Sequence, residues 1–258
     1  MQRYYTSLKL FLFCLLIGLN SLSATISTPY GNQIEAVIFD CDGVLVDTEY
    51  LKFLAWREAL ASENIAFTIE EYMPLVGHSS KNILLMLKKL KNIEIPEGII
   101  GLKDARYRIL QKQGVPPIKE MIAFANYFAS EKTNLGIKLG LASSAPTEEI
   151  LQNLEQIGLE HAFDLIISGS DDLDSYVDDE GKNKPKPYIY MEAAKRLEVA
   201  PSKCLVFEDT SAGIEAAASA GMVAVAVPNQ FTTGQDFSKA KEVIKTYQEL
   251  PLKQIFKD

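Results

Sequence analysis

Two acidic side chains stand where an apolar, strand-like segment ends. In the stretch AVIFDCDGVLVD, Asp40 and Asp42 follow residues 37–39 and directly precede Gly43. The β-branched and aromatic residues before them are typical of a buried strand, where two neighbouring anions are costly unless a cation compensates them. The pair therefore predicts a site at the end of this strand that takes a cationic partner.

Three further segments end in polar residues of complementary chemistry. Ser143 follows the second expected strand, Lys184 precedes a helix after the third, and Glu208 and Asp209 follow the fourth. One aspartate of the first pair can attack phosphorus, and the other can protonate the leaving oxygen and then activate water. The later acids add oxygen ligands for Mg²⁺, while the serine and the lysine can hold phosphate oxygens. The pattern predicts phosphoryl transfer through an aspartyl-phosphate.

The elements that must position these residues alternate between strands and helices after Ile118. The expected strands cover 137–142, 165–167, 205–207 and 223–227, and the expected helices cover 119–132, 147–157, 188–197 and 211–220. Such alternation predicts an α/β fold with a Rossmann-like parallel sheet, covered by helices on both faces. Functional residues of such a sheet collect at the carboxyl ends of its strands.

Between the first and second strands the sequence predicts only helices. Thr48 is expected to cap a helix over 49–61, a second helix begins near Ser80, and a third covers 103–113. The apolar face of the first helix is expected to comprise Leu51, Leu54, Ala55 and Ala59. This texture predicts an inserted all-helical cap domain.

Length and composition fit one core with a small second domain. The chain has 258 residues, of which 47% are hydrophobic and 23% charged. We assign residues 50–117 to the cap, and 32–49 with 118–258 to the core. The formal net charge of −8 and the lack of a basic stripe argue against a partner that is a nucleic acid.

The first residues have the pattern of a signal peptide. Arg3 and Lys9 precede the apolar run 10–19, and small residues follow up to Ser23. We therefore expect residues 1–23 to be removed and the mature chain to be exported, to a periplasm or to the outside, with no stable membrane association. An uncleaved membrane anchor is the alternative, although the run is short for a span.

Cysteine usage indicates no zinc site. Cys14 lies within the expected signal peptide, which leaves Cys41 and Cys204 in or beside apolar runs. Both fit the pattern of small buried hydrophobic residues. In an oxidising compartment they could instead pair as a disulfide.

Four motifs of this chain resemble those of the haloacid dehalogenase-like phosphatases. They read DCDGVLVD, LASSA, KPKP and FEDTSAGIEAA, they occur in the family's order, and the resemblance covers about residues 34–228. The most similar branch carries a helical cap between the first two motifs and includes β-phosphoglucomutase and many sugar-phosphate and phosphoglycolate phosphatases. The resemblance implies a core-and-cap enzyme that uses Mg²⁺.

The resemblance also assigns roles to single residues. Asp40 would be the nucleophile, Asp42 the general acid and base, and Ser143 with Lys184 the phosphate binders. The metal ligands would be Asp40, the backbone carbonyl of Asp42, Glu208 and Asp209. Glu208 could instead accept hydrogen bonds from helix N–H groups. Lys182 and Lys186 are alternative candidates for the phosphate-binding lysine, but the Lys-Pro-x-Pro order of the family selects Lys184.

The cap supplies candidates for contacting the leaving group. They are Thr48, Lys52, His78, Ser79 and Lys81. β-Phosphoglucomutases carry a histidine at the position of Lys52, and at the position of Ser80 an arginine that grips a second phosphate. These departures favour hydrolysis of a small phosphate ester over a mutase reaction.

Two alternatives stay open. One is a sugar-phosphate mutase similar to β-phosphoglucomutase, and the other is a non-enzymatic binding protein that keeps the fold. The complete set of motif acids speaks against the binding protein. Nothing in the sequence indicates an oligomeric state.

Overall fold

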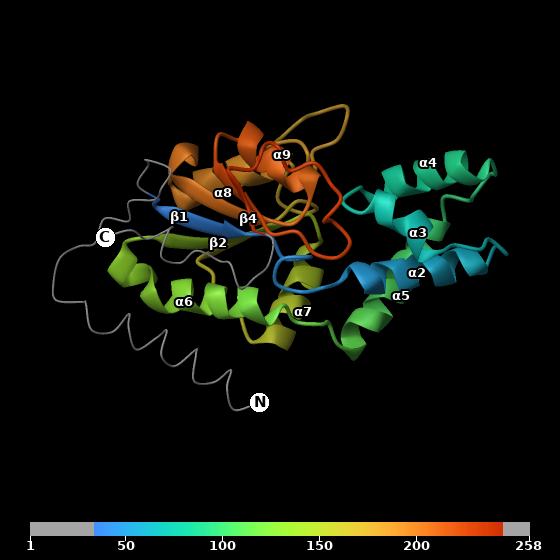
Figure 1. Ribbon diagram of the computed structural model, residues 1–258, viewed down its shortest axis with the longest axis horizontal. Helices are drawn as coiled ribbons and strands as arrows, with labels where there is room; N and C mark the ends of the chain where they lie inside the picture. The colour runs from blue at the N-terminus through green and yellow to red at the C-terminus, as the bar shows by residue number, and fades with distance from the viewer. Residues whose placement is uncertain (1–33, 245–258) are drawn as a thin grey trace.

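The computed structural model describes residues 34–244 as a parallel sheet with helices on both faces and a group of helices beyond one end of the sheet (Figure 1). Within these residues the strand order is β3-β2-β1-β4-β5-β6, and every neighbouring pair is parallel. The strands are β1 (Ala36–Phe39), β2 (Lys138–Ser143), β3 (Leu165–Ser168), β4 (Cys204–Glu208), β5 (Val223–Ala226) and β6 (Glu242–Val243). The expected α/β, Rossmann-like core is confirmed. The expected signal peptide and Cys14 lie outside the described residues.

Alternating side chains of β1 feed two hydrophobic layers. Val37 and Phe39 pack in the layer beneath α6 and α7, whereas Ala36 and Ile38 pack in the layer beneath α8 and α9. These helices are α6 (Lys119–Leu135), α7 (Thr147–Ile157), α8 (Tyr188–Leu197) and α9 (Ser211–Ser219). Because both faces are covered, β1 lies at the centre of the core and its carboxyl end is enclosed.

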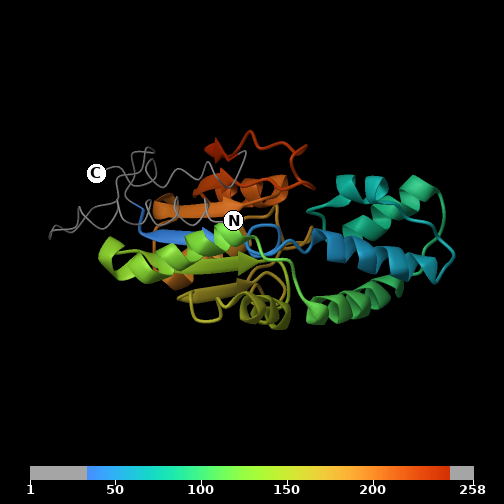
Figure 2. The same cartoon turned by 60° about the horizontal axis from the view of Figure 1, so that its bottom comes forward.

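A second group of helices lies beyond the carboxyl ends of the strands (Figures 1 and 2). It comprises α2 (Glu49–Ala61), α3 (Ile69–Tyr72), a 3-10 turn (Met73–Leu75), α4 (Ser80–Lys91) and α5 (Ile99–Gln113). These helices have a hydrophobic cluster of their own, which includes Trp56, Leu87 and Ile99. They fall in the segment assigned to the cap, and the exact domain boundaries stay a prediction. No described helix is both long and apolar enough to cross a membrane.

The two connections between the core and these helices run side by side. Asp47 N–H donates to Pro116 O at 2.8 Å, and Ile118 N–H donates to Leu45 O at 2.9 Å. The segment that follows β1 is thus tied to the segment that returns to α6. This pairing holds the start of α2 close to the end of β1.

Several local predictions were wrong for physical reasons. The hydroxyl of Thr48 does not cap α2, because it donates to Asp42 instead. The buried face of α2 contains the predicted Ala55 and Ala59 together with Phe53, Trp56 and Leu60, while Leu51 and Leu54 are only half-buried because the large rings occupy the interior. Further departures are the start of α5 at Ile99 rather than Lys103, and the short strand β6, which was not predicted.

Candidate active site

The carboxyl ends of β1 and β4 bring three acids together. Phe39 pairs with Phe207 in the parallel ladder, and Asp40 N–H donates to Phe207 O at 3.0 Å, so Asp40 lies beside Glu208. One carboxylate oxygen from each of Asp40, Glu208 and Asp209 lies within 4.8 Å of the others, and all three residues are buried. The pairing of neighbouring parallel strands thus brings together acids from two sequence motifs that lie far apart in the chain.

Lys184 supplies a cation to this group. Its ammonium lies 2.7 Å from Asp40 Oδ1 and 2.6 Å from Glu208 Oε1, and it donates to Ala142 O at 3.2 Å. We call Asp40, Lys184, Glu208 and Asp209 the strand-end cluster. Its flanking lysines point elsewhere: Lys182 donates to Leu173 O, and Lys186 pairs with Glu180. The choice of Lys184 from the motif order thus agrees with the geometry.

Burial and mutual repulsion dominate the electrostatics of the strand-end cluster. Burial raises the pKa of Asp40 to about 7; Lys184 opposes this shift, while the charge of Glu208 adds to it. Burial, together with the charges of Glu208 and Asp40, raises the pKa of Asp209 well above its usual range. Burial lowers the pKa of Lys184, but Asp40 and Glu208 outweigh it and the net shift is upward. One ammonium therefore does not compensate three buried acids.

The two neighbouring acids of β4 differ in how their oxygens are satisfied. Glu208 Oε2 accepts from the backbone N–H groups of Asp209 and Thr210, and Oε1 accepts from Lys184 and from the Tyr190 hydroxyl. Asp209 Oδ2 accepts from Asn229 at 2.8 Å, whereas Asp209 Oδ1 is buried without a hydrogen-bond partner. Glu208 thus accepts N–H bonds from the two residues that precede α9, not from the helix itself, and among the described residues Asp209 keeps one oxygen without a hydrogen-bond partner.

Two glycines make room for these carboxylates. A Cβ added to Gly43, whose φ is +84°, would lie 2.1 Å from Asp209 Oδ2. A Cβ added to Gly213 on α9 would lie 1.8 Å from Glu208 Oε1. Both positions therefore require glycine for close approach of the backbone.

The donor set fits a hard divalent cation. Three clustered carboxylates offer only oxygen ligands, which Mg²⁺ prefers, and a bare buried carboxylate oxygen costs free energy unless a cation meets it. The residues that could hold such an ion are Asp40, Glu208 and Asp209. Asp42 contributes no side-chain oxygen to this group, and its expected role through its backbone carbonyl stays a prediction.

The side chain of Asp42 enters a second polar group at the start of α2. Thr48 Oγ1 donates to Asp42 Oδ1 at 2.7 Å, and the Lys52 ammonium lies 3.6 Å from Asp42 Oδ2. Lys52 also pairs with Glu49 Oε1 at 2.8 Å, and the Tyr72 hydroxyl donates to Glu49 Oε2 at 2.7 Å. We call these five residues the helix-base cluster. It brings together two of the predicted cap candidates, Thr48 and Lys52.

Lys52 is a half-buried cation in the helix-base cluster. Burial lowers its pKa, but the charges of Asp42 and Glu49 outweigh this and the net shift is upward. The ammonium form thus dominates at neutral pH. It lies where it can orient Asp42, and the direct contact with a leaving group that its sequence position suggested stays a prediction.

Ser143 ends β2 next to the strand-end cluster. It is buried, and its hydroxyl accepts from the backbone N–H of Ala145 at 3.2 Å. The preceding carbonyl, that of Ala142, accepts from Lys184. Ser143 therefore lies one residue from a lysine contact, at the strand end where phosphate binding was predicted.

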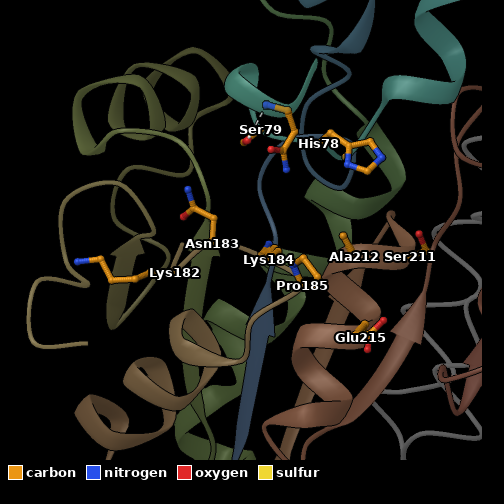
Figure 3. Close-up of a pocket in the computed structure, with 11 residues that line it drawn as sticks. His78, Ser79, Lys182, Asn183, Lys184, Pro185, Ser211, Ala212 and Glu215 are labelled. Atoms are coloured by element: carbon orange, nitrogen blue, oxygen red, sulfur yellow. Dashed lines mark hydrogen bonds between the residues drawn. The ribbon is translucent and has the colours of Figure 1, made fainter. Parts of the chain in front are cut away.

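A pocket of about 310 Å³ opens between the core and the helical group (Figure 3). It is lined by cap residues 77–79 with Asn82, by the loop 182–185, and by Ser211, Ala212 and Glu215 of α9. His78 and Ser79 thus line this pocket and Lys81 does not, while the predicted contact of these residues with a leaving group stays a prediction. In Figure 3 the side chain of Asn183 points towards the cap loop, while that of Lys182 points away.

Comparison with known proteins identifies the family. The model of the haloacid dehalogenase-like hydrolases matches residues 34–221. The chain belongs to the haloacid dehalogenase-like hydrolases. The resemblance noted in the motifs, and the expectation of an enzyme of this family, are confirmed.

Named members of this hydrolase family resemble the chain over most of its length. A phosphorylated carbohydrates phosphatase of Thermotoga maritima is 35% identical over 73% of this chain and 82% of that protein. The β-phosphoglucomutase of Bacillus subtilis is 32% identical over 85% of this chain and 92% of that protein. The crystal structure of CbbY from Rhodobacter sphaeroides in complex with phosphate superposes with a TM-score of 0.70 at 25% identity, over 85% of this chain and 97% of that one.

Sequence reasoning missed several residues around the two clusters of this hydrolase. They are Glu49, Tyr72, Tyr190, Asn229 and Gln235. The pairing of Glu49 with Lys52 could have been predicted from the sequence, because the two residues lie three apart on an expected helix. The others lie far along the chain from the residues they contact, and no local spacing indicates them.

The cysteines lie on opposite faces of the sheet. Cys41 belongs to the layer beneath α6 and α7, and Cys204 belongs to the layer beneath α8 and α9. Both are free and buried. The interpretation as small buried hydrophobic residues is therefore correct, and the disulfide alternative is wrong for this structure.

Proposed function

We propose that the chain is a Mg²⁺-dependent phosphomonoesterase that works through an aspartyl-phosphate on Asp40. The observation that carries the proposal is the strand-end cluster, in which Asp40 lies against a lysine and two further acids, one with a bare oxygen. A carboxylate so placed can act as a nucleophile while cationic groups hold the phosphate. A bound Mg²⁺ would offset negative charge on the transferring phosphoryl group.

The reaction proceeds in two displacements. A carboxylate oxygen of Asp40 forms a bond to phosphorus as the bond from phosphorus to the ester oxygen breaks, and Asp42 gives its proton to that leaving oxygen. Water then loses a proton to Asp42 and attacks phosphorus, which releases inorganic phosphate and restores the Asp40 carboxylate. Asp42 thus returns to its protonated form after each turnover.

The helix-base cluster suits Asp42 for this double role. Thr48 holds one oxygen of the carboxylate, and Lys52 lies near the other. Both partners stand on the segment that begins α2, so the orientation of Asp42 follows the position of that helix. This arrangement keeps the proton donor and acceptor apart from the acids proposed to hold the metal.

Lys184 and Ser143 are proposed to bind the phosphate. All three N–H donors of Lys184 have partners, namely Asp40, Glu208 and the carbonyl of Ala142. Lys184 therefore exchanges one partner for a phosphate oxygen when substrate binds. Within residues 34–244 the Ser143 hydroxyl has the Ala145 N–H as its one hydrogen-bond partner, so its own proton is available for donation.

The proposed substrate is a small phosphorylated carbohydrate. Relatives named as phosphatases of phosphorylated carbohydrates and of fructose 1-phosphate support this class. The pocket beside Lys184 is lined by hydrogen-bonding side chains such as His78, Ser79 and Asn183, which suit hydroxyl groups. Its volume fits a small leaving group.

A sugar-phosphate mutase is the second candidate. The relative named β-phosphoglucomutase favours it, and so does one local feature: the Lys103 ammonium lies 3.4 Å from Ser80 Oγ. That lysine places a cation where the arginine of the mutases is missing, although it also pairs with Asp104 at 3.1 Å. Hydrolysis stays the better-supported function, because this cation is already paired.

The test measures phosphate release from a panel of sugar phosphates, phosphoglycolate and nucleotides, with and without Mg²⁺. We expect Mg²⁺-dependent release from a sugar phosphate and a loss on the order of 10⁴-fold in Asp40→Asn. An Asp40→Asn protein as fast as the parent would overturn the nucleophile assignment. Phosphorus NMR of glucose 1-phosphate with a trace of bisphosphate tests the mutase, which interconverts isomers without releasing phosphate.

We also propose that residues 1–23 act as a signal peptide and that the enzyme is exported. The support is the order of charged, apolar and small residues in that segment. Expression of the full chain followed by N-terminal sequencing should yield a mature chain that begins at Ala24 or Thr25. An intact Met1 in the cytosolic fraction would contradict export.

A further inference from the structure

The loop that follows β5 contacts both the strand-end cluster and the helical group. At one end, Asn229 Nδ2 donates to Asp209 Oδ2 at 2.8 Å and lies 3.4 Å from Gly43 O. At the other end, Gln235 Nε2 donates to Val76 O, which belongs to the helical group, at 3.1 Å. Seven residues thus connect a proposed metal ligand to the cap.

Asn229 also organises the loop itself. Its Oδ1 accepts from the Phe231 N–H at 2.9 Å, and its carbonyl accepts from the N–H groups of Thr232 and Thr233. Its own N–H donates to Thr232 Oγ1 at 3.0 Å. The Asn229 amide is therefore fixed by the turn it makes, and it cannot rotate away from Asp209 without breaking that turn.

The middle of the loop enters the hydrophobic cluster of the helical group. Phe231 is 8% exposed and belongs to the same cluster as Trp56 and Leu87, although it follows β5 in the core. Gln235 Oε1 also accepts from the backbone N–H of Ser211 at 2.8 Å, at the start of α9. A shift of the helical group would consequently pull on both Phe231 and Gln235.

Among the described residues Asn229 makes the only hydrogen bond to the carboxylate of Asp209, which also packs closely against the backbone of Gly43. Its Oδ2 takes the Asn229 bond, and its Oδ1 has no hydrogen-bond partner. The rotation of the carboxylate thus decides whether the bare oxygen faces Asp40 and Glu208 or turns away from them. Partners of this kind commonly change metal affinity when they are removed.

We propose that Asn229 is a positioning residue that aims Asp209 at the metal, and that the loop 229–235 makes this aim depend on the position of the cap. The proposal rests on the proposed function only in taking Asp40, Glu208 and Asp209 as the metal-holding acids. It assigns no contact with the substrate to Asn229. A cap seated on the core, with Phe231 in its cluster, then favours metal binding before any substrate arrives.

The first experiment titrates the full chain, freed of metal, with Mn²⁺ and with Mg²⁺ by calorimetry in the absence of substrate. Asn229→Ala should weaken the Kd for metal by about 10-fold. At saturating Mg²⁺ its KM for the best substrate should stay near that of the parent. If Asn229 had only a structural role, Asn229→Ala would lower the free energy of unfolding and the catalytic activity, but it would not specifically weaken the metal Kd.

The second experiment tests the link to the cap with matched phenylalanines. Phe231→Ala and Phe67→Ala each remove a buried ring from the helical group's cluster, with side chains 8% and 5% exposed, but only Phe231 lies on the loop. Phe231→Ala should weaken the metal Kd about 3- to 10-fold, while Phe67→Ala should leave it unchanged. In an Asn229→Ala background, Phe231→Ala should add no further loss, because both act through Asp209.

The outcomes separate this inference from the proposed function. If the parent binds Mn²⁺ and Asn229→Ala binds it equally well, the positioning role of Asn229 is wrong. The proposed function as a phosphomonoesterase would still stand. If Phe231→Ala and Phe67→Ala change the Kd alike, or the double variant shows additive losses, the link to the cap is wrong. A parent chain that binds no divalent metal overturns both proposals.

Discussion

Asp40 and Asp42 are separated by one residue, yet their carboxylates enter different surroundings. In the strand-end cluster, the one ammonium contacts Asp40 and Glu208, and Asp209 Oδ1 has no hydrogen-bond partner among the described residues. In the helix-base cluster, Thr48 and Lys52 meet the two oxygens of Asp42, and Lys52 and Tyr72 meet those of Glu49. The helix-base cluster is the more exposed of the two, since the side chains of Lys52 and Asp42 are 22% and 12% exposed, whereas those of Lys184, Asp40 and Glu208 are at most 8% exposed.

The difference separates a site that needs an external cation from one that is complete. An unpaired buried carboxylate oxygen is costly, and it persists where a ligand compensates it on binding. A carboxylate with partners on both oxygens is instead held in one orientation, as a proton donor and acceptor requires. Strand alternation does not explain the separation, because residues two apart share one face of a strand and both aspartates lie in the segment that follows β1.

Metal removal should abolish the function of the strand-end cluster and leave the interactions of the helix-base cluster unchanged. Chelation should reduce phosphate release to background, and added Mg²⁺ should restore it. Because a ligand that binds only the folded state stabilises it, Mg²⁺ at about 100 times its Kd should add about 2.7 kcal/mol to the free energy of unfolding. Thermal melts of the parent, of Asp209→Asn and of Thr48→Val provide the measurement.

Only Asp209→Asn should lose the stabilisation by Mg²⁺. Thr48→Val removes a donor from the helix-base cluster and should respond to Mg²⁺ as the parent does. An equal loss in both variants would mean that the two clusters form one electrostatic unit.

Lys52→Gln tests whether the helix-base cluster supports proton transfer by Asp42 without affecting metal binding. Without the ammonium, Asp42 and Glu49 lose their shared cation, and kcat should fall about 10- to 100-fold with the Mg²⁺ affinity unchanged. Lys88→Gln is the matched control, since Lys88 pairs with the exposed Glu94 and touches neither cluster. Steady-state kinetics over a range of Mg²⁺ concentrations would separate the two effects, and an altered metal affinity in Lys52→Gln would contradict the comparison.

A pair of glycine substitutions compares the space around the strand-end cluster with a helix surface. Gly213→Ala would place a Cβ against the Glu208 carboxylate, so we expect a loss of about 1–3 kcal/mol in the free energy of unfolding. Gly101→Ala in α5 meets no atom within 4 Å and should stabilise by up to about 1 kcal/mol. Urea denaturation of both variants checks the contrast, which fails if Gly213→Ala is neutral.

The smallest expected effect on stability concerns an exposed ion pair. Asp164, whose side chain is 37% exposed, pairs with Lys132 and accepts the Leu139 N–H. Burial raises the pKa of Asp164, but the bonds from Lys132 and Leu139 outweigh this and the net shift is downward. A lowered folded pKa contributes stability above the unfolded value of 3.8, and this contribution is lost as the pH falls through the folded value.

Asp164→Asn should therefore destabilise the chain at pH 7 by no more than about 1 kcal/mol, because solvent screens the pair. Below the folded pKa the difference from the parent should vanish. Urea midpoints at pH 7 and pH 3 measure it, and a larger effect at the lower pH would have the wrong sign.

Local patterns determined the framework and the acids of the strand-end cluster. The bounds of α2, α7 and α8 follow from helix periodicity and end signals such as Pro146 and Gly158, and the structure has the predicted residues at their ends. The motif acids stand at strand ends, and parallel strands bring such ends to one edge. For this reason Asp40, Lys184, Glu208 and Asp209 could be grouped without coordinates.

Only the tertiary structure decided which partner each polar atom takes. The Thr48 hydroxyl can cap a helix or bond Asp42, and the choice depends on how the start of α2 is tied to the returning chain. Tyr72 reaches Glu49 across 23 residues, and Asn229 reaches Asp209 across 20. Periodicity and end signals act over a few residues, whereas hydrogen bonds between distant segments depend on packing, which no local pattern encodes.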